Sequence, residues 1–234
     1  MPIGIIINCI SIIAGGLIGT IVKERLTERW RSSLNMLFGL ASTGMGISSV
    51  VLMQNMPAVV LSLILGTCLG LALHFGEGIT AAAGKMQKLF GMQDSAQSAM
   101  LVTIIVLFCA SGTGIYGSLV SGMSGDHSIL IAKSILDLFA AMIFACTLGL
   151  VVSLIAVPQF VIMITLFLLA GVIVPLTTPA MINDFKACGG FLMIATGLRI
   201  LQLKQFPTAD MIPSMILVMP LSWMWVTYIL PLLS

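Results

Sequence analysis

Long apolar runs alternate with short polar connectors along this chain. Eight such runs lie at approximately residues 2–22, 34–53, 57–76, 100–120, 128–154, 159–177, 187–203 and 211–233. Most approach the length of about 20 residues that an α-helix needs to cross the hydrocarbon core of a bilayer. The pattern therefore predicts an all-α protein, a polytopic transmembrane helical bundle of about seven or eight spans. We expect residues 1–234 to form a single integral membrane domain.

Composition supports this assignment and excludes other classes of protein. Of the 234 residues, 59% are hydrophobic and 8% are charged, whereas a soluble domain carries about 25% charged residues. Such a chain is too apolar to be intrinsically disordered, and a net charge of +2 is too small for a nucleic-acid-binding surface. The five cysteines lie inside apolar runs without a Cys-x-x-Cys pair, so they are interpreted as small apolar residues.

Lys and Arg residues are divided unequally between alternate connectors. Seven lie in connectors that share one side of the predicted bundle: Lys23, Arg25, Arg29, Arg31, Lys85, Lys88 and Lys204. On the other side we expect Lys186, in the connector before the seventh run, together with Asn183 and Asp184. The positive-inside rule makes the first side cytoplasmic, and an even number of spans then places both termini in the periplasm. No basic segment precedes the first run, so we expect a membrane helix there and not a cleaved signal peptide.

Two stretches of the chain resemble each other in their glycine positions. Residues 14–47 and residues 170–200 each contain an Ala-Gly pair, a polar connector and a glycine-rich apolar segment. If a duplication explains the similarity, the first three and the last three spans form an inverted repeat, an arrangement that many transporters share. The alternative is chance similarity between helices rich in Gly, Leu and Ile.

The densest polar signal lies at the start of the fifth run. Asp126, Lys133 and Asp137 are spaced so that all three fall within about 40° of one helical face. The adjacent stripe holds His127 and Ser134. Because an ionisable residue at the centre of a span costs about 2.5–3.5 kcal/mol, we expect these side chains to face the bundle interior. Their spacing also predicts an ion pair between Lys133 and Asp137.

Five glycines precede or border this polar group: Gly112, Gly114, Gly117, Gly122 and Gly125. A helix broken at such glycines frees backbone groups that a cavity, an ion or water must satisfy, which predicts a polar path lined by this segment. In the alternative interpretation, the ion pair fixes helix packing and Asp126 caps a helix. The glycines would then serve close helix packing, as we expect for Gly15-x-x-x-Gly19 and Gly66-x-x-x-Gly70.

Known catalytic motifs are absent from the sequence, including Gly-x-Ser-x-Gly, the P-loop and His-Glu-x-x-His. We therefore expect no enzyme activity, no catalytic residue, no cofactor and no metal site. The pattern favours a small-solute or ion transporter or channel-like protein. The alternative is a non-transporting membrane scaffold or regulatory protein in which the same ion pair is structural. The expected partners are the lipid bilayer and an unidentified small solute or ion, not nucleic acid, and a homo-oligomer is left open.

The residues described above carry a resemblance to a known family. The central segment is Cys109-x-x-Gly112, Gly117, Gly122-x-x-Gly125-Asp126-His127, Lys133-Ser134-x-x-Asp137 and Gly149. Supporting positions nearer the two ends are Asn8, Gly15-Gly16, Gly19, Gly39-Leu40, Gly44, Gly189-Gly190 and Gly197-Leu198. On these residues the chain resembles the bacterial inner-membrane family DUF554, the YqgA/YdfK-like group. The resemblance covers nearly the whole chain and implies an inner (plasma) membrane location and a transport role, without a substrate.

Overall fold

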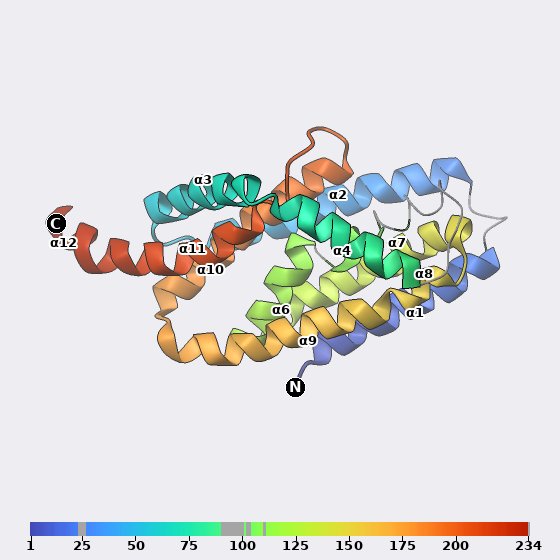
Figure 1. Ribbon diagram of the computed structural model, residues 1–234, viewed down its shortest axis with the longest axis horizontal. Coiled ribbons are helices and arrows are strands. Elements are labelled where there is room, and N and C mark those ends of the chain that lie inside the picture. The colour runs from blue at the N-terminus through green and yellow to red at the C-terminus, as the bar shows by residue number, and fades with distance from the viewer. Residues whose placement is uncertain (23–26, 90–100, 102–103, 110, 234) are drawn as a thin grey trace. The chain divides into compact units, whose positions relative to one another are not determined.

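The protein is helical over most of the residues that the structure, a computed structural model, describes: 1–22, 27–89, 101, 104–109 and 111–233. The helices are α1 (Ile3–Val22), α2 (Glu28–Val50), α3 (Met56–Ala72), α4 (Phe75–Leu89), α6 (Gly112–Ser124), α7 (Ser128–Leu148), α8 (Val151–Leu154), α9 (Ala156–Ile173), α10 (Pro179–Ile200), α11 (Ile212–Met224) and α12 (Leu230–Leu233). A 3-10 turn (Val174–Leu176) follows α9, and a π-helical turn (Trp225–Ile229) follows α11. Figure 1 labels the α-helices. No strand occurs in these ranges, and the all-α prediction is confirmed.

Several helices are long and apolar enough to cross a membrane. Five segments meet this description: Ile3–Val22, Ile104–Ser124, Ser128–Leu148, Val151–Leu176 and Ile212–Leu232. A bent pair, Met56–Ala72 with Phe75–Lys85, makes a sixth if it is counted as one span. The polar residues inside α2 and α10 lower the hydropathy of those two helices. The described residues thus support five or six spans, while the count of seven or eight and the inverted repeat stay predictions.

The fifth predicted run, residues 128–154, ends earlier than expected. Gly149 adopts a φ of 70°, a left-handed conformation that favours glycine, and its N–H donates to the carbonyl oxygen of Ala145. This cap ends α7 at Leu148. Residues 151–154 therefore form α8 and begin the next candidate span, Val151–Leu176, instead of ending the fifth.

The seventh predicted run, residues 187–203, corresponds to a helix that begins earlier than expected. Thr178 caps α10 by accepting the N–H of Met181 on its hydroxyl, and Pro179 occupies the first helical position, where its missing N–H costs nothing. The helix starts eight residues before the predicted run. Asp184 and Lys186 consequently lie inside a helix, and the expectation that they belong to a connector is wrong.

The chain divides into two compact units, each of which is formed by two separate stretches of the sequence. Unit 1 comprises residues 1–38 and 77–171, and unit 2 comprises residues 39–76 and 172–234. The single integral membrane domain over residues 1–234 stays a prediction.

Unit 1 is organised around a close contact between α1 and α7 (Figure 1). A Cβ atom added to Gly15 would lie 2.2 Å from the carbonyl oxygen of Leu138, and one added to Gly19 would lie 2.1 Å from that of Met142. The contact moves toward the C-terminus along both helices, from Gly15 with Leu138 to Gly19 with Met142, so the two helices run parallel. The expected packing role of the Gly15-x-x-x-Gly19 motif is confirmed, because side chains at these positions would push the backbones apart.

Unit 2 has the same kind of close packing at glycines between α3 and α11, which lie side by side in Figure 1. A Cβ atom on Gly66 would lie 2.3 Å from the Cα of Ser214, and one on Gly70 would lie 2.0 Å from the carbonyl oxygen of Asp210. Here the residue number increases along α3 while that of its contact decreases, from Ser214 to Asp210, so the two segments run antiparallel. The packing role of Gly66-x-x-x-Gly70 is confirmed as well.

Candidate functional site

Lys133 and Asp137 lie near the middle of α7, one turn apart on the same face. Their side chains form an ion pair between Nζ and Oδ2 and are 4% and 10% exposed, which confirms the pairing predicted from the sequence. The Lys133 Nζ also lies 5.8 Å from the centroid of the Phe108 ring. Because water solvates this pair poorly, other protein groups must supply the hydrogen bonds that its atoms lose on burial.

Asn8 of α1 supplies the next hydrogen bond. It is fully buried, and its Nδ2 donates to Asp137 Oδ2 at 2.8 Å. The reach of an Asn side chain is short, so this bond requires the close approach of α1 and α7 that Gly15 and Gly19 permit. The glycine packing in unit 1 thus places a polar group directly on the buried carboxylate.

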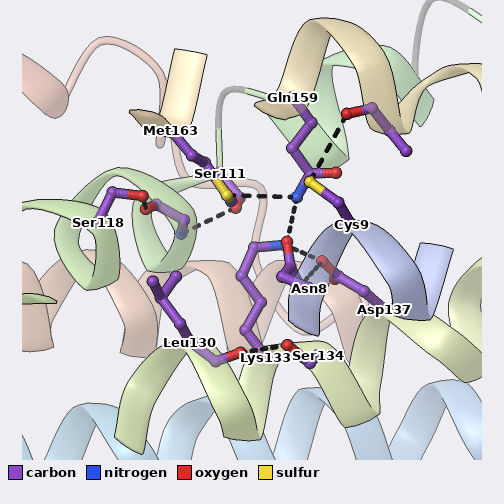
Figure 2. Close-up of polar contacts among 12 residues, drawn as sticks. Asn8, Cys9, Ser111, Ser118, Leu130, Lys133, Ser134, Asp137, Gln159 and Met163 are labelled. Atoms are coloured by element: carbon purple, nitrogen blue, oxygen red, sulfur yellow. Dashed lines mark hydrogen bonds and ion pairs between the residues drawn. The ribbon is translucent and has the colours of Figure 1, made fainter. Parts of the chain in front are cut away.

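Gln159 of α9 extends the chain of hydrogen bonds to a third helix (Figure 2). Its Nε2 donates to Asn8 Oδ1 and lies 3.7 Å from Met163 Sδ. Gln159 is fully buried, and its Oε1 has no hydrogen-bond partner among the described residues. We refer to Asn8, Lys133, Asp137 and Gln159 as the polar cluster.

A helix break lies against the polar cluster. Residues 104–109 are helical and α6 begins at Gly112, but Ser111 between them has an extended backbone, with φ −73° and ψ 139°. The Ser111 Oγ accepts the N–H of Gly114 at 3.1 Å. A Cβ atom on Gly114 would lie 3.1 Å from Lys133 Cε and 2.9 Å from Met163 Cε, so the lysine stem packs on the first turn of α6. The break lies at Ser111, just before the glycine segment, and Gly112–Ser124 is a continuous helix, so the break expected at the glycines themselves is not found there.

The other polar residues predicted for this site lie outside the cluster. Asp126 is exposed, precedes α7, and accepts the N–H of Ser128 at 2.9 Å, so the expectation that it shares a helical face with the ion pair is wrong. A 2.7 Å hydrogen bond joins the Nδ1 of His127 and the hydroxyl of Ser121. Ser134 donates to a backbone carbonyl of its own helix. A role for these three residues in transport stays a prediction.

The five glycines of the predicted path have different positions in the structure. Gly114 lies at the polar cluster. Gly117 and Gly122 pack closely on other helices, because added Cβ atoms would lie 2.9 Å and 2.4 Å from atoms of α7 and α9. Gly125, with a φ of 70°, ends α6, and Gly112 is its first residue. That these glycines line a cavity stays a prediction.

Sequence reasoning did not assign Asn8 or Gln159 to the site. Asn8 is a single amide within the apolar run 2–22, and this isolation is the signal that could have identified it, since an unpaired amide in a span is costly. Gln159 follows Pro158 and lies at the edge of the predicted run 159–177. The candidate span begins at Val151, so Gln159 lies inside it.

Unit 2 contains a second buried carboxylate, that of Asp184 in α10. Its Oδ1 accepts the backbone N–H groups of Gln54 and Asn55 at 2.8 and 2.9 Å. Its Oδ2 accepts Asn55 Nδ2 at 2.8 Å and the hydroxyl of Ser222 at 2.6 Å. Asp184 thereby holds the N-terminus of α3 against α10 and α11. Both oxygens are occupied, which is typical of a structural clamp.

Each of the two units contains an Asn–Asp hydrogen bond of the same kind. In both, an Asn Nδ2 donates to an Asp Oδ2 at 2.8 Å, and in both the two residues are 129 positions apart, Asn8 with Asp137 and Asn55 with Asp184. A third helix adds a polar contact in each unit, Gln159 to the Asn in unit 1 and Ser222 to the Asp in unit 2. The same arrangement of groups therefore organises both units, although only the cluster of unit 1 includes a lysine.

Substitution of the ion pair tests whether Lys133 and Asp137 are energetic partners. Lys133→Met or Asp137→Leu alone leaves one buried charge uncompensated and should lower the free energy of unfolding by about 3–5 kcal/mol. The double variant removes both charges and should be more stable than either single variant, although Asn8 loses its acceptor. Unfolding of the purified proteins in detergent measures this. A double variant no more stable than the worse single variant would show that the two are not partners.

Comparison with known proteins gives a consistent relationship. The model of the family described as "Protein of unknown function (DUF554)" matches residues 3–223. The uncharacterized protein YqgA of Escherichia coli K12 is 48% identical over 97% of this chain and 99% of its own length. The uncharacterized membrane protein YdfK of Bacillus subtilis 168 is 27% identical over 92% of this chain and 93% of its own.

A shorter similarity relates part of the chain to a second group. A UPF0756 membrane protein of Pectobacterium carotovorum is 36% identical over 96 residues, which is 39% of this chain and 64% of that protein. No solved structure matches the chain significantly. Because the family model covers nearly the whole sequence and relatives align from end to end, the chain belongs to the DUF554 family.

Proposed function

We propose that this protein transports a small solute or an ion across the bacterial inner membrane, with the polar cluster of unit 1 as its binding site. The observation that carries the proposal is the helix break at Ser111, which lies against Lys133 inside a candidate span. Transporters bind solutes at discontinuous helices, where the N–H groups of a helix start have no intrahelical partner and carry partial positive charge.

The free energy needed to bury the polar cluster supports a functional role. Lys133 and Asp137 are buried in α7, and Asn8 and Gln159 are fully buried in two further helices. Replacing a buried ion pair by apolar side chains of similar volume is often neutral or stabilising, so packing alone does not require one. Lys133 also has three N–H donors, of which the described contacts use one. Donors that have no other partner among the described residues can bind a solute.

A non-transporting scaffold is the second candidate function. The observation that favours it is the tight packing of α1 on α7, where Gly15 and Gly19 bring the two backbones into contact. In a scaffold the polar cluster would fix the relative positions of α1, α7 and α9 and would bind nothing. The two functions differ in whether solutes cross the membrane faster when the protein is present.

We further propose that both termini are periplasmic, which rests on the division of Lys and Arg between connectors and on an even number of spans. A periplasm-active reporter fused after Ser234 should be active, and a cytoplasm-active reporter at the same position should be inactive. The reverse pattern would mean that the chain crosses the membrane an odd number of times or in the opposite orientation.

Solute efflux from vesicles tests the transport function even though the substrate is unidentified. Vesicles with purified protein are loaded with a small-molecule extract of bacterial cells, and the solutes that leave are identified by mass spectrometry. At least one solute should leave faster than from protein-free vesicles. Asp137→Asn should remove this difference because it takes away the counter-charge of Lys133.

The matched control for this experiment is Thr165→Val, which removes an exposed hydroxyl of α9 that bonds only a carbonyl of its own helix. This variant should retain the efflux of the unaltered protein. Unfolding of each variant in detergent shows whether a loss of efflux reflects a loss of structure. If no solute leaves faster than from protein-free vesicles, the transport function fails and the scaffold function is favoured.

A further inference from the structure

The hydrogen bonds of the polar cluster have a fixed direction. An ionised carboxylate accepts hydrogen bonds and donates none, so Asn8 must turn its Nδ2 toward Asp137. The Oδ1 of Asn8 then faces Gln159, which must donate from its Nε2. The acceptor character of Asp137 thus fixes the orientation of both amides, and Gln159 Oε1 is the last acceptor in this series of hydrogen bonds.

This terminal acceptor has no donor among the described residues. Gln159 is fully buried. Among the described residues, its Oε1 is the one buried side-chain nitrogen or oxygen atom that has no hydrogen-bond partner. A buried acceptor without a donor lowers stability, and native proteins contain few such groups. Rotating the Gln159 amide does not solve the problem, because its oxygen would then face Asn8 Oδ1.

The charge of the surroundings limits what can bind there. Lys133 and Asp137 already compensate each other, so a bound ion would add an uncompensated charge among apolar helices, where burying a charge is strongly unfavourable. The amides of Asn8 and Gln159 do not ionise near neutral pH, so this chain of bonds does not carry protons as titratable groups would. An uncharged molecule with a hydrogen-bond donor fits both conditions.

We propose that Gln159 Oε1 is a solute contact and that it receives a hydroxyl or amide N–H of a small uncharged polar solute. The inference rests on the proposed transport function and specifies its class of substrate. Gln159 is fully buried, so the solute reaches Oε1 when the helices around it separate, as alternating access requires. The Gln159 Nε2 lies near Met163, which also contacts the first turn of α6, so the contact adjoins the helix break.

Light scattering from protein-containing vesicles tests this inference with glycerol and urea as the probes. Both are uncharged and carry hydrogen-bond donors, and potassium chloride serves as the charged comparison. The protein should accelerate vesicle reswelling with glycerol or urea over protein-free vesicles, and it should not accelerate potassium chloride entry. Gln159→Met, which has no acceptor at Oε1, should reduce the accelerated rate about fivefold or more, as expected for the loss of one hydrogen bond.

Two further variants control the experiment. Thr165→Val, on the same helix but exposed, should keep the full rate. Gln159→Asn keeps an amide but withdraws it by one methylene group. It should lose the acceleration too, and it replaces Gln159→Met if that variant does not fold.

Three results would overturn the inference. They are no acceleration with either probe, an equal acceleration in the Gln159 variants, and faster water permeation without solute permeation, which would assign a resident water to Oε1. If the efflux experiment identifies a solute that depends on Asp137 while glycerol and urea give no acceleration, the transport function holds and this inference fails. If no solute depends on the protein in either experiment, both fail.

Discussion

A carboxylate buried among apolar helices must obtain hydrogen-bond donors from the protein, and the arrangement of unit 1 follows from this constraint. Asp137 takes one donor from Lys133 on its own helix and one from Asn8 on α1. The bond to Asn8 requires that α1 and α7 touch, which Gly15 and Gly19 permit. The acceptor character of Asp137 then sets the direction of both amides and leaves Gln159 Oε1 without a donor among the described residues. One buried charge thereby determines a helix contact, a hydrogen-bond direction and a candidate binding position.

Unit 2 meets the same constraint in a different way. Asp184 also pairs with an Asn 129 positions earlier, but the residue four positions before it is Ala180, where Asp137 has Lys133. Backbone N–H groups at the start of α3 and the hydroxyl of Ser222 take the place of the lysine. Both oxygens of Asp184 are occupied, whereas unit 1 keeps an acceptor without a donor among the described residues. This difference favours a structural role for the carboxylate of unit 2 and a binding role for the polar cluster of unit 1.

The sequence predicted the helical class, the approximate positions of the helices and the Lys133–Asp137 pair, because apolar length and helical spacing are local properties of the chain. It did not predict that Gly149 ends α7, since a glycine in an apolar run fits close packing as well as a left-handed cap. Nor did it bring together Asn8 and Gln159. Their contact depends on which helices are neighbours, and residues 151 positions apart share no local pattern.

The coupling of Asn8 to Asp137 is the most direct measure of this account, because the direction of the whole chain of hydrogen bonds starts at that contact. Free energies of unfolding of Asn8→Leu, Asp137→Leu and the double variant give this coupling, with Asn8→Leu and Ser134→Ala as the control pair. The Ser134 hydroxyl donates to the carbonyl oxygen of Leu130 in its own helix, α7, and does not serve the polar cluster. We expect a coupling of about 0.5–3 kcal/mol for Asn8 with Asp137, and additive effects in the control pair. Additive effects of Asn8→Leu and Asp137→Leu would contradict it.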